Sequence, residues 1–168
     1  VVLIVDSLTR LAKTYTTTAA QQGRSVPGMV NPTSLFRAKK LFGAARCMKE
    51  GGSLTIIAAM DVETGMKVDD TIVEEFRGTA NMQLVLDTAV AKAGVRPPFN
   101  LPQCYTKHAE QLLTKEQLEG VALTRQILGT THSATAIPQL LSMMDKVDSN
   151  VTFLSRVKDW AALMNKGR

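Results

Sequence analysis

The chain has 168 residues, of which 45% are hydrophobic and 21% are charged, and its formal net charge is +5. These values are ordinary for a soluble globular protein, and the length suits one domain with a core better than two. No apolar run is long enough to span a membrane and no signal peptide is evident, so we expect a cytoplasmic protein without a membrane partner. The positive charge allows a polyanionic partner but does not require one.

The first element is a short apolar strand that ends at an acid. Residues 1–5 are apolar without alternation, which is typical of a strand buried on both faces of a parallel sheet. Asp6 then falls at the carboxyl end of the strand, where such an acid can serve the Mg²⁺ of a nucleoside triphosphate. The alternative is that Asp6 only caps the next helix. Because the chain starts at Val1 with a core strand, we expect a fragment of a larger protein.

A helix and a long loop follow this strand. Apolar residues at helical spacing predict an amphipathic helix over residues 7–18. The segment 19–33 contains two Gly and two Pro, which predicts a long mobile loop with a functional role. Within this loop, Arg24 lies between Gly23 and Ser25 and is a candidate phosphate contact.

The next segments predict a helix, a strand, a loop and a shorter helix. Thr33 or Ser34 can cap the first of these helices, and Asp69 or Asp70 can cap the second. In chain order we expect a helix from residue 34 to about Glu50 that ends at Gly51-Gly52, a buried strand over residues 53–59, a turn-rich loop over residues 61–70 with an exposed lysine, and a helix over residues 71–77.

The rest of the chain predicts mostly helices. In order, we expect a partly exposed third strand over residues 81–86, helical turns over residues 87–93, an extended proline-rich segment over residues 95–105, a helix from a capping box at residues 114–117 to Gly129, and helices over residues 136–147 and 151–165. Cys47 and Cys104 lack metal-ligand spacing, so we expect buried, reduced thiols. His108 and His132 have no ligand partner at helical spacing, and we expect both on the surface.

Five blocks of sequence resemble one family when they are taken together. They occur in order at residues 6–12, 41–46, 50–58, 63–65 and 74–82, and they read DSLTRLA, LFGAAR, EGGSLTIIA, ETG and EEFRGTANM. These blocks resemble the ATPase domain of the bacterial transcription termination factor Rho family, which are ring-forming RNA translocases. The match is strong over residues 1–90 and weaker beyond them.

The resemblance implies the fold class α/β. Residues 1–168 are expected to be the C-terminal portion of a RecA-like ATPase domain, a partial αβα sandwich with a mainly parallel sheet, helices on both faces and a helical C-terminal end. Residues 1–90 would carry the Walker B strand and the RNA-channel loops, and residues 91–168 the proline-rich segment and the C-terminal helices. The resemblance also implies a homo-hexamer that binds ATP and Mg²⁺ between subunits, threads RNA through its ring and acts functionally on RNA polymerase.

The resemblance also implies roles for individual residues. Asp6 matches the Mg²⁺-linked catalytic carboxylate, and Arg10 lies close to the nucleotide. Gly23, Arg24 and Ser25 fall in the segment that matches the Q-loop, which approaches RNA in the central channel. Thr64, Gly65 and Lys67 match the R-loop, where Lys67 would grip the RNA backbone without reading its sequence.

Two interface arginines of the family are changed in this chain. The first position is Gly94, with Arg96 displaced by two residues, and Lys107 stands at the second position. We take Arg96 and Lys107 as the candidate catalytic residues that replace them, although lysine cannot reproduce the guanidinium fork. The 168 residues also contain no Gly-x-x-x-x-Gly-Lys-Thr/Ser loop, so the chain alone is not expected to hydrolyse ATP.

Two functions therefore stay open for the intact protein. The first is an RNA-dependent, ATP-driven hexameric translocase that terminates transcription. The alternative is a non-catalytic Rho-like protein that binds RNA or associates with a ring and has lost ATP turnover. Another RecA-like motor, such as a rotary ATP synthase subunit or an export ATPase, is disfavoured by the EGGSLTII run and by the Thr-Gly-x-Lys loop at residues 64–67.

Overall fold

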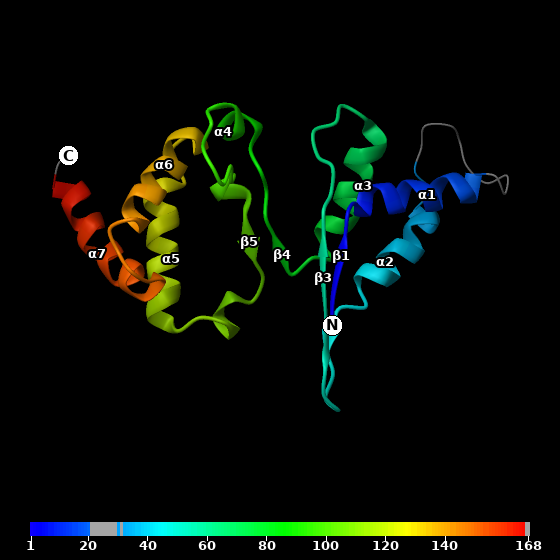
Figure 1. Cartoon of the computed structure of the whole chain (residues 1–168), viewed down its shortest axis with the longest axis horizontal. Coiled ribbons are helices and arrows are strands. Elements are labelled where there is room, and N and C mark those ends of the chain that lie inside the picture. Colours follow the sequence, from blue (N-terminus) through cyan, green and yellow to red (C-terminus); the bar gives the residue numbers. More distant parts are fainter. Residues whose placement is uncertain (21–29, 31, 167–168) are drawn as a thin grey trace. The chain divides into compact units, whose positions relative to one another are not determined.

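The computed structural model describes residues 1–20, 30 and 32–166. The chain forms two compact units, residues 1–80 and 81–168 (Figure 1). This boundary precedes the division near residue 90 that the sequence suggested. Within the described ranges, no helix combines the length and the apolar character needed to cross a membrane.

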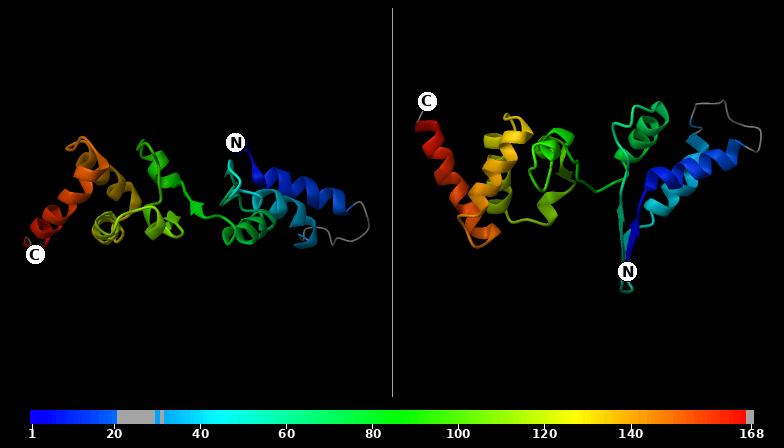
Figure 2. Two further views of the ribbon diagram at one scale, coloured as in Figure 1. Left: turned by 90° about the horizontal axis from the view of Figure 1, so that it is seen from below. Right: turned by 45° about the horizontal axis from the view of Figure 1, so that its top comes forward.

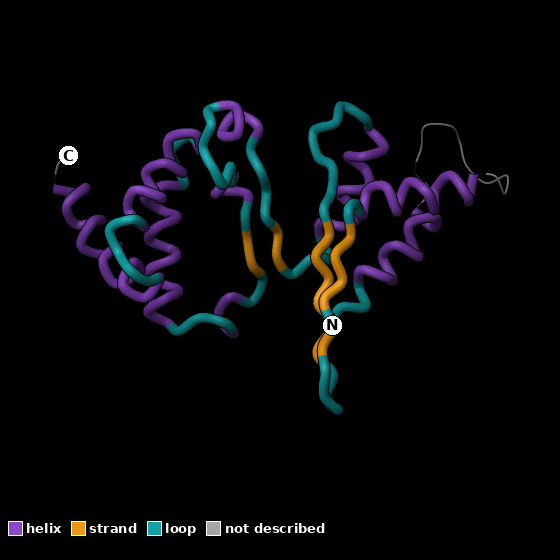
Figure 3. Tube along the Cα trace, in the orientation of Figure 1, coloured by secondary structure: helices purple, strands orange, loops and turns teal. Residues whose placement is uncertain are grey.

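The first unit is a small mixed sheet with three helices. Its elements are β1 (Val2–Val5), α1 (Leu8–Ala20), the 3₁₀ turn η1 (Pro32–Leu35), α2 (Phe36–Phe42), β2 (Arg46–Cys47), β3 (Ser53–Ala58) and α3 (Lys67–Arg77). The strand order is β1-β3-β2, with β1 parallel to β3 and β2 antiparallel to it (Figure 3). The core between the helices consists of Leu8, Ala12, Leu35, Ala38, Ile72 and Phe76. The strand, helix and strand expected at residues 1–5, 7–18 and 53–59 are confirmed.

The sheet of the first unit is covered on one face. Helices α1, α2 and α3 all lie on the same side of β1 and β3 (Figure 1). Ile4 and its register partner Ile57 point to the other side, where they are 73% and 57% exposed. The expectations that β1 is buried on both faces and that the strand over residues 53–59 is buried are therefore wrong for this chain. The unbroken apolar run of residues 1–5 makes both faces of β1 apolar, and α1, α2 and α3 cover only one of these faces.

The helix expected from residue 34 to Glu50 is wrong over its second half. Helix α2 ends at Phe42, and β2 then pairs with β3 in a hairpin whose turn contains Gly51 and Gly52. Both glycines have positive φ, +107° and +84°, which suits a tight turn and not a helix end. The N-cap residue of α2 is Leu35, which makes no side-chain capping hydrogen bond, so the cap expected at Thr33 or Ser34 is not at the start of this helix; the Ser34 hydroxyl is hydrogen-bonded to that of Thr16 at 3.1 Å.

The second unit is mostly helical. Its elements are β4 (Met82–Gln83), α4 (Thr88–Lys92), η2 (Leu101–Gln103), β5 (Tyr105–Thr106), η3 (Ala109–Gln111), α5 (Lys115–Leu128), α6 (Ser133–Met144) and α7 (Asn150–Lys166). Helices α5, α6 and α7 follow one another through short connections (Figure 2). The expected capping box is confirmed, since Thr114 and Gln117 cap each other's backbone at the start of α5. The helical turns expected over residues 87–93 and the helices expected over residues 114–129, 136–147 and 151–165 are present as α4, α5, α6 and α7.

Two expectations for strands and thiols need correction. The third strand expected over residues 81–86 is only the two-residue β4, and it pairs antiparallel with β5 in a separate sheet. Cys47 is exposed on β2 and not buried, because β2 is an edge strand at the hairpin. Cys104 is partly buried, and its thiol contacts the backbone of Val85. His108 and His132 are exposed, as expected.

The packing of α5 on α7 depends on a glycine. A Cβ built on Gly120 would lie 3.0 Å from Leu154 Cβ and 3.2 Å from its carbonyl oxygen. We expect Gly120→Ala to lower the free energy of unfolding by about 1–3 kcal/mol, because the helices must separate to admit the methyl group. Urea unfolding measures this loss. Gly78→Ala is the control, since nothing lies within 4 Å of a Cβ there and φ is −75°. Equal losses in the two variants would contradict the close contact.

Candidate functional site

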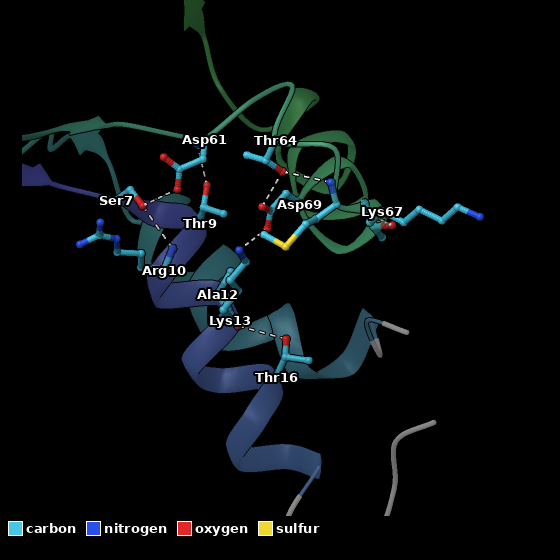
Figure 4. A network of polar contacts seen from close by, with 12 residues as sticks. Ser7, Thr9, Arg10, Ala12, Lys13, Thr16, Asp61, Thr64, Lys67 and Asp69 are labelled. Carbon is cyan, nitrogen blue, oxygen red and sulfur yellow. Dashed lines mark hydrogen bonds and ion pairs between the residues drawn. The ribbon is translucent and has the colours of Figure 1, made fainter. Parts of the chain in front are cut away.

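The carboxyl ends of β1 and β3 meet at one edge of the first unit. Because the two strands are parallel and adjacent, the turns that follow them are held together. Leu8 N–H donates to Ala59 O at 2.8 Å, and Asp61 N–H donates to the hydroxyl of Thr9 at 2.9 Å (Figure 4). This edge therefore carries Asp6 after β1 and Asp61 after β3.

Ser7, and not Asp6, caps helix α1. The Ser7 hydroxyl accepts the Arg10 N–H at 3.2 Å and donates to the Asp61 carboxylate at 3.2 Å. The carboxylate of Asp6 is exposed and makes no hydrogen bond or ion pair with the described residues. The capping explanation for Asp6 is therefore wrong, and its carboxylate remains available to a ligand.

Arg10 extends this edge from the first turn of α1. Its guanidinium is exposed and has no ion-pair partner within the described ranges. Figure 4 shows it on the side of α1 away from the contact between α1 and α3. Asp6 and Arg10 thus present one free carboxylate and one free guanidinium at the start of the same helix.

Lys67 lies on a helix and not on a loop. Helix α3 begins at Lys67, four residues earlier than the expected residue 71, and the turn before it contains Gly65 with φ of +77°. Thr64 shapes this turn, since its hydroxyl accepts Met66 N–H at 3.3 Å. The Lys67 ammonium is exposed, extends away from the unit in Figure 4, and has no partner among the described side chains. A free cation on a helix start is more rigidly placed than one on a flexible loop.

Asp69 is the buried charge of the first unit. Its side chain is 1% exposed, and its carboxylate lies 2.6 Å from the ammonium of Lys13 on α1. Thr64 donates a hydrogen bond to its other oxygen at 2.8 Å. The Lys13 ammonium holds the pKa of the Asp69 carboxyl below its ordinary value, and the Thr64 hydroxyl adds to this effect while burial opposes it. The Asp69 carboxyl therefore stays ionised at neutral pH.

The sequence contained a signal for this buried acid that the cap interpretation missed. Asp69 precedes Ile72 by three residues and Phe76 by seven, so all three lie on one face of α3. An acid on an apolar helix face requires a buried partner. Lys13 supplies it, although it is distant in the sequence.

The candidate interface residues belong to the second unit. Gly94 has φ of +77° and follows α4. The Arg96 guanidinium donates to the carbonyl oxygens of Ala91 and Val95 at 3.1 and 3.0 Å, which caps the end of α4. Lys107 is exposed next to β5, and its N–H donates to Asn81 O at 2.8 Å. Gly23, Arg24 and Ser25 lie outside the described residues.

The donor set at the β1 edge fits a magnesium ion that is also held by phosphates. Within the described ranges, no group of three or more His, Cys, Asp or Glu side chains could hold a metal. Mg²⁺ commonly takes one or two carboxylates, with water and substrate phosphates completing its shell. The free carboxylate of Asp6 matches the protein's part of that arrangement, and Asp6 is the residue that would hold the ion.

Comparison with protein families matches one family to the larger part of the chain. The profile of the "ATP synthase alpha/beta family, nucleotide-binding domain" matches residues 1–106, which is more than half of the chain. The chain belongs to this family. The matched residues include β1, Asp6 and helix α3 with Lys67.

The resemblance to Rho is also confirmed by curated relatives. The chain is 42% identical over 157 residues to the transcription termination factor Rho of Thermotoga maritima, covering 94% of this chain and 37% of the relative. It is 39% identical over 159 residues to the Rho of Borreliella burgdorferi, covering 95% of this chain and 31% of the relative. The chain thus spans about a third of the length of these proteins.

Solved structures confirm the α/β fold class. The assembled ATPase EscN from the type III secretion system of enteropathogenic E. coli matches with a TM-score of 0.72 over 95% of this chain and 45% of that chain. The two sequences are 18% identical, so this likeness concerns the fold alone. The chain is accordingly a partial RecA-like α/β fold with small sheets and many helices.

Proposed function

We propose that the chain is the part of a Rho-type ATPase domain that links the nucleotide edge to RNA. The intact protein would be an RNA-dependent, ATP-driven hexameric translocase that terminates transcription by RNA polymerase. This proposal rests on the 42% identity to Rho and on one observation in the structure. A free carboxylate, Asp6, and a free ammonium, Lys67, are both carried by the compact unit of residues 1–80.

The nucleotide side of the proposal uses Asp6 and Arg10. Asp6 would hold Mg²⁺, which supplies charge neutralisation for the phosphates of ATP. The exposed guanidinium of Arg10, one turn along α1, would stabilise phosphate oxygens close to the same edge. Both side chains are exposed and have no hydrogen-bond or ion-pair partner among the described residues, so both can reach a ligand.

The RNA side of the proposal uses the start of α3. Lys67 would bind a backbone phosphate as a point charge, and the N-terminus of α3 adds the positive end of the helix dipole. Thr64 and Gly65 form the turn that presents it. The Q-loop residues Gly23, Arg24 and Ser25 remain candidates for a second RNA contact.

The second candidate is a Rho-like protein that binds RNA without turning over ATP. The observation in its favour is that Arg96 donates to the end of its own helix α4, so its guanidinium is already engaged within one unit. The ammonium of Lys107 is a point charge and cannot form the two parallel hydrogen bonds of the guanidinium group of an arginine finger. An assay of ATP hydrolysis by the intact protein, with and without RNA, separates the candidates. Absence of turnover with RNA present would reject the translocase.

Lys67→Ala tests the RNA contact. In the intact protein we expect weaker RNA binding whatever the RNA sequence. The slope of the logarithm of the binding constant against the logarithm of the salt concentration should become smaller in magnitude by about one. RNA should also stimulate ATPase activity less. RNA titrations at several salt concentrations measure all three. Binding of nucleotide without RNA should change little, because Lys67 does not touch the β1 edge.

Lys40→Ala is the matched control for that experiment. Lys40 is also an exposed lysine of the first unit, but it lies on α2. We expect it to leave the salt dependence unchanged. If both variants weaken RNA binding equally, the effect comes from net charge and the specific role of Lys67 is rejected.

A further inference from the structure

The segment between β3 and α3 is fastened to α1 at both of its ends. At its start, Asp61 accepts a hydrogen bond from Ser7 and donates its N–H to the buried hydroxyl of Thr9. At its end, Asp69 is paired with Lys13. Thr9 and Lys13 are four residues apart and therefore lie on the same face of α1 (Figure 4). One helix face thus holds both ends of the turn that presents Lys67.

The contact at the end of the segment involves the more deeply buried of the two acids. Asp69 is 1% exposed, whereas Asp61 lies on the surface. A buried carboxylate cannot leave its cation without a large desolvation cost, so Asp69 and Lys13 must move together. Thr64 joins them, because its hydroxyl donates to Asp69 from within the turn.

The same helix begins at the nucleotide edge. Ser7, directly after Asp6, caps α1, and Leu8 N–H is bonded to the turn after β3. A displacement of α1 that follows from a change at Asp6 therefore reaches Asp69 through a single helix and the ion pair between Lys13, which is 36% exposed, and the buried Asp69 carboxylate. Asp69 lies in the first turn of α3, two residues after Lys67.

We propose that Lys13 and Asp69 are positioning residues that fix Lys67 to α1 and so couple RNA contact to the state of the nucleotide edge. This inference deepens the proposed function and rests on it. Neither residue touches nucleotide or RNA in this assignment. If α1 couples the nucleotide edge to Lys67, the ion pair between Lys13 and Asp69 must be intact, and a stable fold alone is not sufficient.

The test compares variants of the pair in the intact protein. The variants are Lys13→Met, Asp69→Asn, the double variant Lys13→Met/Asp69→Asn, and Lys13→Arg, which keeps the ion pair. The matched control is Lys39→Met, which breaks the pair between Lys39 of α2 and Glu75 of α3 in the same unit. For each protein we would measure ATPase activity with and without RNA, and the affinity for RNA in the absence of nucleotide.

The coupling role predicts a loss of stimulation and not of activity. We expect the ratio of RNA-stimulated to basal ATPase activity to fall about 5- to 100-fold in the first three variants. Basal activity and nucleotide-free RNA affinity should stay within about threefold of the wild type, and Lys13→Arg should restore most of the stimulation. Lys39→Met should retain it.

The double variant separates coupling from stability. It leaves no buried charge, so it folds even if Lys13→Met alone does not. If the pair only stabilises the fold, the double variant recovers stimulation, and the inference is overturned. Stimulation that persists in all variants overturns it as well. A wild-type protein that RNA does not stimulate would instead reject the proposed function itself.

Discussion

Asp6→Asn is expected to abolish ATP turnover by the intact protein, lowering kcat by at least about 10²–10³-fold. The amide has nearly the same shape as the carboxylate, but it lacks the charge that Mg²⁺ requires. The fold should persist, because Ser7 and not Asp6 caps α1, and because the Asp6 side chain is exposed without a partner among the described residues. Steady-state ATPase assays with RNA present, together with the thermal unfolding midpoint, test both statements.

Asp61→Asn is the matched control for this variant. Both acids follow neighbouring parallel strands at the same edge, but the Asp61 carboxylate accepts the hydroxyl of Ser7, and an amide oxygen can accept it as well. We expect turnover to remain within about tenfold of the wild type. Equal losses in the two variants would assign the effect to the summed charge of the edge and would reject a specific metal contact by Asp6.

Phe76→Ala is expected to lower the free energy of unfolding by about 3–5 kcal/mol. Phe76 is 1% exposed on α3, and its ring packs edge-on against that of Phe42 at a centroid distance of 6.0 Å. Its removal leaves a cavity among α1, α2 and α3 that the helices cannot fill without moving. Since Lys67 and Asp69 share α3 with Phe76, RNA stimulation of ATPase activity should also fall.

Leu41→Ala provides the comparison for the core variant. Leu41 lies on α2 in the same unit but is 37% exposed, so its truncation should cost about 1 kcal/mol or less. Urea denaturation of both variants, followed by the circular dichroism of the helices, measures the difference. Similar losses for the two would show that Phe76 does not anchor the core of the first unit.

Patterns of neighbouring residues in the sequence were sufficient to predict several helices and strands. The apolar run before Asp6 predicted β1, and the capping box at Thr114 and Gln117 predicted the start of α5. These signals reside in neighbouring residues, so they need no knowledge of the rest of the chain. The same locality explains the success with α1, whose stripe of apolar residues repeats at helical spacing.

Long-range pairing accounts for the errors. Residues 46–47 lie in a segment with an apolar stripe typical of a helix, yet they form β2 because β3 offers them a strand to pair with. Glycine often follows the end of a helix, but in this chain Gly51 and Gly52 lie in the turn of a hairpin. Neither outcome can be read from the local sequence, since both depend on hydrogen bonds to residues across the turn.

For the candidate site too, residue order predicted some features and only the tertiary structure determined others. The sequence by itself determined that Asp6 follows a strand, that Arg10 lies one turn along the next helix, and that the five blocks resemble Rho, because these are properties of residue order. Only the tertiary structure decided that Ser7 takes the capping role, that Lys67 begins a helix, and that Asp69 is buried against Lys13. The physical reason is that burial and ion pairing join residues far apart in the sequence, and only the packing of α1 on α3 brings them together.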